Sequence, residues 1–139
     1  NKYSKICLGK KDVSMIKNSS ENMKIFEGFF DFLSFKNIEK SLENESSDYV
    51  ILNSVSMISK IKNSLENYKK IDLYFDNDEA GNKAVKMLKN EMENVKDFRV
   101  LYSDFKDLNE WAMSSTKLEE KLGGSLVQKV PKVYNKRGR

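Results

Sequence analysis

The sequence has no histidine and only one cysteine and one proline among its 139 residues. Without histidine, a Ser-His-Asp triad, a Cys-His pair and a Cys/His zinc cluster are all excluded. The single cysteine, Cys7, cannot form a disulfide within the chain, and we expect it to be a small buried apolar side chain. Any metal must therefore be bound through oxygen ligands, which Mg²⁺, Mn²⁺ and Ca²⁺ prefer.

Long apolar runs are also missing. No segment approaches the roughly 20 apolar residues that a membrane-spanning helix needs, and no basic segment followed by an apolar one suggests a signal peptide. We therefore expect a soluble, cytoplasmic protein with no membrane partner. Hydrophobic residues make up 39% of the chain and charged residues 33%. This composition fits one compact domain with a modest core under a charged surface.

The charge balance is mildly basic, with a formal net charge of +4 from 25 basic and 21 acidic residues. This balance permits a polyanionic partner without demonstrating one. Much of the excess lies in residues 123–139, which we interpret as a basic, flexible tail or, alternatively, a nucleic-acid contact. Residues 23–122 form the expected domain, and 1–22 a lead-in from a longer protein. The tail residues that have no acidic neighbour are Lys129, Lys132, Lys136, Arg137 and Arg139.

Hydrophobic patterns predict strands that alternate with helices. Alternation of this kind indicates βαβ crossovers, and hence an α/β fold of about four mainly parallel strands flanked by helices. Before this region, residues 6–8 suggest a short strand, and a helical turn capped by Asp12 or Ser14 is expected through Ile16. The predicted strands lie at 23–27, 49–52, 71–75 and 98–102, and the predicted helices at 29–35, 58–65, 80–93 and 108–114.

Acidic residues follow three of the predicted strands: Glu27, then Asp76 and Asp78, then Asp104 and Asp107. In open α/β sheets, ligands bind beyond the carboxyl ends of the strands. Two aspartates at positions i and i+2 of extended backbone point the same way and can face one cation. Crowded carboxylates repel one another until a divalent cation is bound. An ordinary helix cap remains the alternative for the Asp-x-Asp pair.

Three segments resemble the motifs of Toprim domains. Residues 25–31 resemble the strand-Glu-Gly-x-x-Asp motif, and residues 75–81 resemble Asp-x-Asp-x-Ala-Gly in its primase form. Residues 106–110 resemble the Lys-Asp-x-Asn/Asp-Glu segment of bacterial-type primases. Ala80, where topoisomerases usually carry glutamate, favours the primase-like branch. The turn at 53–56 is more similar to Toprim proteins of mobile elements.

The resemblance implies a Rossmann-like Toprim fold and assigns roles to individual residues. Glu27 takes a general acid–base role, and Asp76 and Asp78 bind Mg²⁺ or Mn²⁺. Asp31 and Asp107 become secondary acidic positions for metal or substrate, although Asp31 could instead be a first-turn helix acid. We expect the phenylalanines of the first motif to belong to the core: Phe26, Phe29, Phe30, Phe32 and Phe35.

The function that the resemblance implies is Mg²⁺-dependent nucleotidyl or phosphoryl transfer on DNA or RNA, in a primase-like protein of DNA replication or mobilisation. Nucleoside triphosphates and other domains of a parent protein would be partners. Bacterial-type primases also use a basic subdomain and a zinc module, and neither is recognisable in these 139 residues. We therefore expect this chain to bind metal but to prime weakly or not at all. A Toprim nuclease and a non-catalytic docking module are the alternatives.

Overall fold

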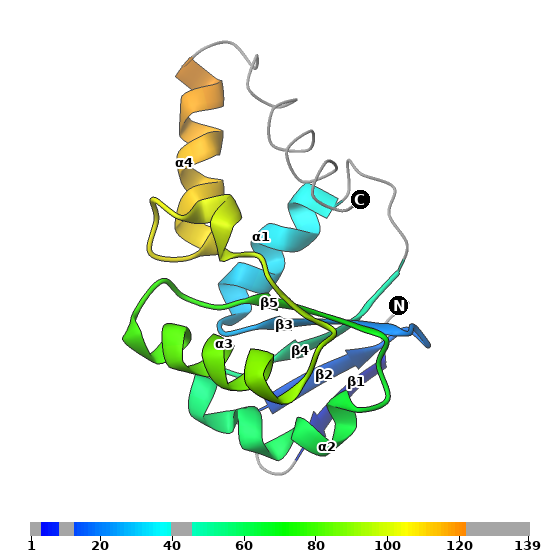
Figure 1. Ribbon diagram of the computed structural model, residues 1–139. Coiled ribbons are helices and arrows are strands. Elements are labelled where there is room, and N and C mark those ends of the chain that lie inside the picture. The colour runs from blue at the N-terminus through cyan, green and yellow to red at the C-terminus, as the bar shows by residue number, and fades with distance from the viewer. Residues whose placement is uncertain (1–3, 9–12, 40–45, 122–139) are drawn as a thin grey trace.

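A six-stranded sheet in the order β1-β2-β4-β3-β5-β6 forms the centre of the computed structural model, which describes residues 4–8, 13–39 and 46–121. Helices cover both faces of this sheet (Figure 1). The strands are β1 (Ser4–Leu8), β2 (Val13–Lys17), β3 (Asn22–Phe26), β4 (Asp48–Ile51), β5 (Lys70–Tyr74) and β6 (Val95–Asp97). The helices are α1 (Phe29–Glu39), α2 (Lys62–Leu65), α3 (Glu79–Glu91) and α4 (Leu108–Lys121), with 3₁₀ turns η1 (Val55–Lys60) and η2 (Arg99–Tyr102).

The central strands are parallel, as the alternation of strands and helices predicts. β3 pairs with β4 on one side and β5 on the other, and β5 pairs with β6, all in parallel. The carboxyl ends of β3, β4 and β5 therefore lie at one edge of the sheet. Strand β2 pairs antiparallel with β4, and β1 pairs antiparallel with β2. The α/β fold is confirmed, and the sheet also includes β1, which covers the short strand expected at 6–8, and β2, which was not expected.

The additional strands come from the segment that we expected to be a lead-in. Residues 13–17 form strand β2 and not the expected helical turn, because β4 offers them a backbone partner and the sheet buries Val13 and Met15. Local sequence does not show this partner, since β4 follows some 30 residues later. The segment 1–22 thus contributes two strands to the same sheet as the motif-bearing residues.

The predicted fourth strand is shifted toward the N-terminus. The strand β6 ends at Asp97, and residues 99–102 form the 3₁₀ turn η2. The turn buries Phe98 and Tyr102 in an aromatic core while Val100 stays 55% exposed. A short apolar run is compatible with either structure, so periodicity alone could not decide. The helix expected at 58–65 is likewise divided into η1 and α2, which meet at Ile61.

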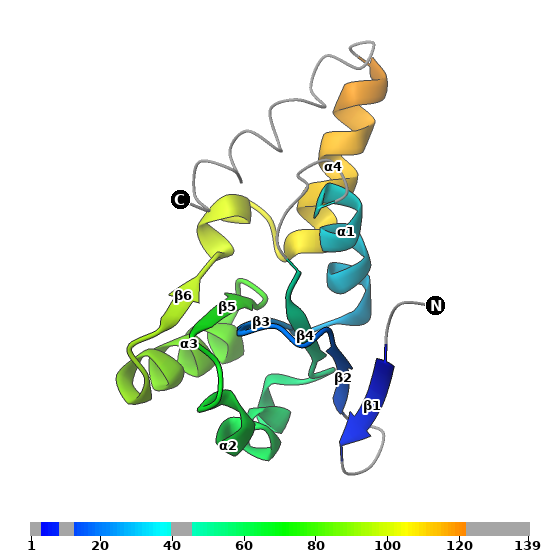
Figure 2. The same cartoon turned by 90° about the vertical axis from the view of Figure 1, so that its right-hand side faces the viewer.

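Two hydrophobic cores lie on opposite faces of the sheet, because successive residues of a strand point to opposite sides. In β3, Met23 and Ile25 face the aliphatic core under η1, α2 and α3. Phe26 faces the aromatic core under α1, η2 and α4, where it stacks on Tyr74 with ring centroids 4.9 Å apart. Figure 2 shows α1 and α4 together on one side of the sheet and α2 and α3 on the other.

The expectation that all five motif phenylalanines are core residues is partly wrong. Phe26, Phe32 and Phe35 are buried, but Phe29 and Phe30 are 47% and 68% exposed. The cause is helical geometry: α1 turns only one face toward the sheet, and its first two residues lie beyond that face. Two aromatic rings therefore lie in solvent next to Glu27.

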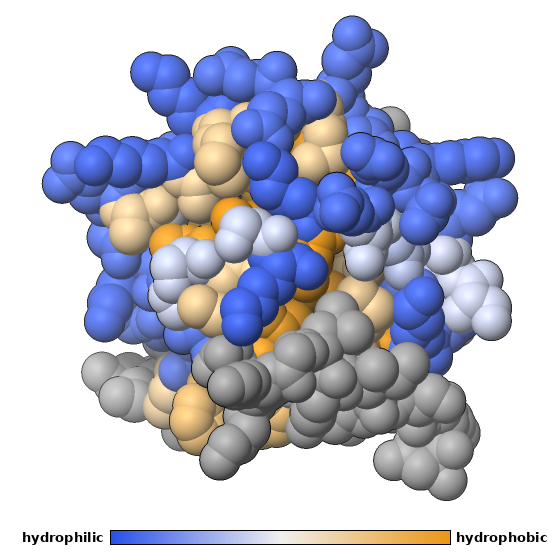
Figure 3. Space-filling view, turned by 90° about the horizontal axis from the view of Figure 1, so that it is seen from below, coloured by the Kyte–Doolittle hydropathy of each residue, from blue (hydrophilic) through white to orange (hydrophobic). Residues whose placement is uncertain are grey.

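The face over the aliphatic core is largely polar. Figure 3 views the face over the aliphatic core and shows hydrophilic side chains surrounding a smaller apolar centre. Among the described helices, none combines the length and the hydropathy needed to cross a bilayer. The side chain of Cys7, the only proline (Pro131) and the basic tail at 123–139 lie outside the residues whose positions the structure describes.

Candidate metal centre

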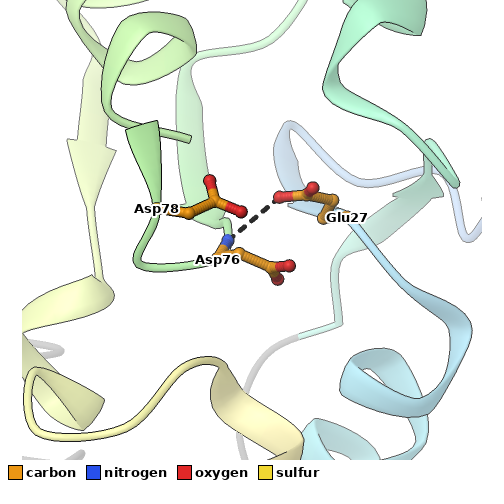
Figure 4. Close-up of side chains that lie close together, drawn as sticks. All are labelled: Glu27, Asp76 and Asp78. Carbon is orange, nitrogen blue, oxygen red and sulfur yellow. Dashed lines mark hydrogen bonds between the residues drawn. The ribbon is translucent and has the colours of Figure 1, made fainter. Parts of the chain in front are cut away.

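Glu27 follows the last residue of β3 and points toward the end of the neighbouring strand β5. Its Oε1 accepts a hydrogen bond of 3.0 Å from the backbone N–H of Asp76 (Figure 4). Burial raises the pKa of Glu27, the bond from Asp76 lowers it, and the negative charges of Asp78 and Asp107 raise it again. Glu27 thus holds its proton more tightly than an exposed glutamate does.

Asp78 caps a helix and also belongs to an acidic cluster, so the two alternatives for the Asp-x-Asp pair hold together. It is the N-cap of α3, in extended backbone, and its Oδ1 accepts a hydrogen bond of 2.8 Å from the N–H of Gly81. The cap uses one of the several acceptor positions of the carboxylate, so the others can still bind a cation. Capping and metal binding are therefore compatible uses of this one carboxylate.

The first turn of α3 packs against the Asp-x-Asp loop without a gap. A Cβ added to Gly81 would lie 2.2 Å from the backbone oxygen of Asp76. No side chain fits in that space, so a residue without one is required at position 81. The close approach fixes the distance between Asp76 and the start of α3.

Asp76 lies among several carboxylates and has the most perturbed pKa of the candidate ligands. Burial, followed by the charges of Glu27 and Asp31, raises the pKa of Asp76 to about 7. A neighbouring cation would stabilise the charged form of this carboxylate and so lower its raised pKa. Such a perturbed group in a cleft is a recognised sign of a functional site.

Asp31 connects the first helix with the last. It is only 5% exposed, and its Oδ1 accepts a hydrogen bond of 2.9 Å from the N–H of Asn109 in α4. Burial raises the pKa of Asp31 to about 6, although the bond from Asn109 opposes this rise. Asp31 is thus more than a first-turn helix acid, since it joins α1 to α4.

Asp107 precedes α4 and takes part in a reciprocal cap. Its Oδ1 accepts from the N–H of Glu110 at 2.8 Å, and Glu110 accepts in turn from the N–H of Lys106 at 2.7 Å. This arrangement is similar to a capping box, except that Glu110 accepts from the residue before the cap, and the two bonds hold the start of the helix in place. Asp104, the other acid that follows the expected fourth strand, belongs to neither acidic group among the described residues.

The candidate ligands form two groups that share Asp76. Glu27, Asp76 and Asp78 make one group, and Asp31, Asp76 and Asp107 the other. Within each group, one oxygen per residue lies within 4.8 Å of the others. All five side chains offer carboxylate oxygen, the donor that Mg²⁺ and Mn²⁺ prefer, so the residues fit a divalent cation of this kind. The structure thus brings together all five acids that the motifs single out.

The chain matches the family described as Toprim-like over residues 24–112, which is more than half of its length. It belongs to the Toprim-like family. The matched range begins in β3 and ends in α4, so it contains all five acids of this Toprim domain. No curated protein sequence matches the chain.

Three solved structures resemble this Toprim domain. The primase fragment of the bacteriophage T7 primase-helicase aligns with a TM-score of 0.54 and 19% identity, over 82% of this chain and 46% of the other. The primase domains in a T7 lagging-strand DNA polymerase complex align with a TM-score of 0.57 and 21% identity, over 81% of this chain and 59% of the other. A small Toprim domain protein from Bacillus stearothermophilus aligns with a TM-score of 0.46 and 21% identity, over 75% of this chain and 88% of the other. This chain thus spans roughly half of the T7 primase chains, and the likeness to them shows the fold.

The motif comparison did not single out Asn77, which lies between the two aspartates of the Toprim domain. Its backbone N–H donates to the carbonyl of Lys106 at 2.7 Å. Its side-chain Nδ2 donates to the carbonyls of Tyr102 at 2.9 Å and Phe105 at 2.7 Å. An asparagine between two aspartates hints at a turn, but the hint is weak, because asparagine is common in turns where it only makes local hydrogen bonds.

The acidic groups open into a pocket with mixed lining. Glu27, Asp31, Asp76 and Asp107 line it, together with the exposed rings of Phe29 and Phe30 and the side chains of Asn53 and Asn109. Asn53, directly after β4 and Leu52, has a positive φ of 68°, a conformation that asparagine adopts more readily than most residues. Carboxylates and aromatic rings therefore face the same opening.

Proposed function

We propose that this Toprim domain assists nucleotidyl or phosphoryl transfer on nucleic acid with Mg²⁺ or Mn²⁺, as part of a primase-like protein of DNA replication or mobilisation. One observation carries the proposal: five carboxylates from three separate segments of the chain converge in two groups that share Asp76. Such a cluster is costly unless a cation offsets the repulsion. Phosphoryl-transfer sites have this need, because their metals hold substrate phosphates as well as protein ligands.

In the proposed site, Glu27, Asp76 and Asp78 would hold one cation and Asp31, Asp76 and Asp107 a second. A cation bound there supplies charge stabilisation for phosphate oxygens. Glu27 accepts or returns the proton of the attacking or leaving hydroxyl. Its raised pKa suits this role, because a general acid–base works best with a pKa close to the working pH. The bond from Asp76 keeps the carboxylate of Glu27 in one orientation.

Similarity to the T7 structures suggests the partners. One of them contains primase domains bound to an RNA/DNA hybrid and dTTP, alongside a DNA polymerase. By analogy, we propose DNA or RNA and nucleoside triphosphates as ligands of the whole protein, with further domains of the parent protein completing the site. We expect the 139-residue chain alone to bind metal and to prime weakly or not at all.

A Mn²⁺ titration of the wild-type chain and of Glu27→Gln tests the proposal. We expect the wild type to bind Mn²⁺ at millimolar concentration or below, and Glu27→Gln to bind it more weakly. The matched control is Glu93→Gln, which removes an exposed carboxylate outside both acidic groups and should leave binding unchanged. No binding by the wild type would contradict the proposal and favour a docking module.

The reaction class needs a second assay, with the full-length protein. Template-directed synthesis of oligoribonucleotides that Glu27→Gln abolishes would support the primase-like reaction. Metal-dependent nicking of plasmid DNA that the same substitution abolishes would support a nuclease instead. Oligoribonucleotide synthesis by residues 1–139 alone would contradict the expectation that other domains are needed.

A further inference from the structure

The loop that carries Asp107 lies outside the sheet, and hydrogen bonds from Asn77 attach it to the Asp-x-Asp loop. Residues 103–107 connect η2 with α4, and their backbone bonds to the Asp-x-Asp loop through Asn77. We propose that Asn77 is a positioning residue that holds Asp107 against Asp76 and so assembles the second acidic group. This inference rests on the proposed function, because it assigns a role to a residue within that site.

Asn77 uses every hydrogen that it can donate for this attachment. Its backbone N–H donates to Lys106, the neighbour of Asp107, at 2.7 Å. Both donor positions of its side-chain amide are taken up by the carbonyls of Tyr102 and Phe105, at 2.9 and 2.7 Å. Three bonds from one residue to three carbonyls within residues 102–106 leave this segment little freedom to move relative to Asp76.

The position of Tyr102 adds a second attachment on the same side. Its hydroxyl donates a hydrogen bond of 2.8 Å to the carbonyl of Phe75, two residues before Asn77. Tyr102 is 1% exposed, so this bond is sheltered from water. The start of the loop is thus fixed by Tyr102, and its middle and end depend on Asn77.

The first acidic group does not depend on these bonds. Glu27 is held by the N–H of Asp76, and Asp78 by the N–H of Gly81 within α3. Neither contact involves the loop at 103–107. A change at Asn77 is therefore expected to separate the two groups: it weakens the Asp31–Asp76–Asp107 group and leaves the Glu27–Asp76–Asp78 group in place.

The main test variant is Asn77→Leu, which keeps the branched shape of the side chain and removes both amide donors. The carbonyls of Tyr102 and Phe105 then lose these partners, and the loop is free to move away from Asp76. Asn90→Leu is the control, because Asn90 is exposed at the end of α3 and lies outside the site. Asn77→Ser, a smaller change, serves if the leucine variant does not fold.

Mn²⁺ binding counted by electron paramagnetic resonance is the primary measurement. We expect two ions on the wild type and on Asn90→Leu. On Asn77→Leu we expect one ion at wild-type affinity, with the second bound roughly 10–100-fold more weakly, as is typical when a support of a metal ligand is removed. A second ion bound by Asn77→Leu as tightly as by the wild type would overturn the inference.

A double-mutant cycle separates positioning from a general loss of structure. Asp107→Asn removes the charge of Asp107 and keeps a residue that can cap α4. If Asn77 acts through Asp107, the double variant binds the second ion no more weakly than Asp107→Asn alone. Additive losses would mean that Asn77 acts in some other way, and would overturn the inference.

Failure of the proposed function has a different signature. If the wild type binds no Mn²⁺, the metal proposal fails, and hydrogen exchange then decides the positioning role. In that case, faster exchange of the Lys106 and Asn109 amides in Asn77→Leu, with the Gly81 amide unchanged, supports the inference. Unchanged exchange at Lys106 and Asn109 overturns it.

Discussion

The backbone N–H of Asp76 donates a hydrogen bond to Oε1 of Glu27, which lies 49 residues earlier in the sequence. The bond joins the ends of β3 and β5, which are neighbours in the sheet. It gives Glu27 a fixed orientation at a position where like charges surround it. A backbone donor can do this at any pH, because it carries no titratable proton.

The crowding of carboxylates predicts that the metal-free domain loses stability as pH rises. The pKa values of Asp31 and Asp76 are raised in the folded state to about 6 and about 7. The folded chain therefore binds more protons than the unfolded chain from about pH 4 upward, and unfolding becomes easier as pH passes through 6–7. We expect the free energy of unfolding in chelator to fall by on the order of 1–3 kcal/mol between pH 5 and pH 8.

Thermal unfolding in chelator at pH 5 and pH 8 measures this difference. Saturating Mg²⁺ should remove most of it, because a bound cation favours the charged carboxylates and binds the folded state. Asp76→Asn, which has no proton to lose, should show a smaller dependence on pH. A melting temperature that rises from pH 5 to pH 8 in chelator would contradict the prediction.

Two substitutions of Asp78 should distinguish its role as a helix cap from the role of its negative charge in metal binding. Asparagine caps helices about as well as aspartate, so we expect Asp78→Asn to change stability by no more than about 0.5 kcal/mol. Asp78→Ala removes the bond to the N–H of Gly81 and should cost about 1 kcal/mol. Both variants should bind Mn²⁺ more weakly than wild type. Equal Mn²⁺ affinity of Asp78→Asn and wild type would exclude Asp78 as a ligand.

Gly81→Ala should disturb the site through the backbone. The added Cβ would lie 2.2 Å from the oxygen of Asp76, so the start of α3 must move. We expect a loss of at least about 1–3 kcal/mol in stability together with weaker Mn²⁺ binding. Gly28→Ala is the comparison, since its Cβ would meet only the Asp31 side chain, at 3.1 Å. Urea unfolding of both variants tests the expectation, which fails if Gly81→Ala is as stable as wild type.

Two phenylalanines of α1 should respond in opposite ways to truncation. Phe32 is 6% exposed and packs on Phe26, so Phe32→Ala should cost about 3–5 kcal/mol of stability. Phe30 is 68% exposed, so Phe30→Ala should change stability by less than about 0.5 kcal/mol. If the proposed substrate is correct, Phe30→Ala should lower the affinity for single-stranded nucleic acid by about 1–3 kcal/mol, the usual effect of losing one stacked base.

Fluorescence anisotropy with a labelled oligonucleotide and Mn²⁺ measures that affinity. Phe29→Ala offers an intermediate case, because its ring is 47% exposed. Unchanged binding by Phe30→Ala would mean that its ring contacts no base, and would contradict the prediction.

Local patterns were sufficient to find the central strands and the acids that follow them. A short run rich in apolar residues, followed by Asp-x-Asp and an amphipathic helix, predicts a strand, a turn and a cap, and β5, Asp76, Asp78 and α3 have this arrangement. The interactions concerned lie within a few residues of one another. The sequence is informative wherever the partner of a residue is close along the chain.

Long-range partners account for the errors. Residues 13–17 are a strand because β4 pairs with them. The strand β6 ends before Phe98 because the aromatic core on α1 and α4 offers burial to Phe98 and Tyr102. Phe29 and Phe30 are exposed because α1 presents another face to the sheet. In each case the deciding neighbour is far away in the sequence, and no local pattern reports it.

The sequence by itself determined the α/β fold, the Toprim-like family and the five acids, because strand periodicity and the Asp-x-Asp motif are local properties. Only the tertiary structure decided which carboxylates meet. The adjacency of β3 and β5 brings Glu27 to Asp76, and the packing of α1 on α4 brings Asp31 to Asp107. The role of Asn77 likewise became visible only with its partners in place, since hydrogen bonds to residues 102–106 depend on the folding of a loop some 25 residues away.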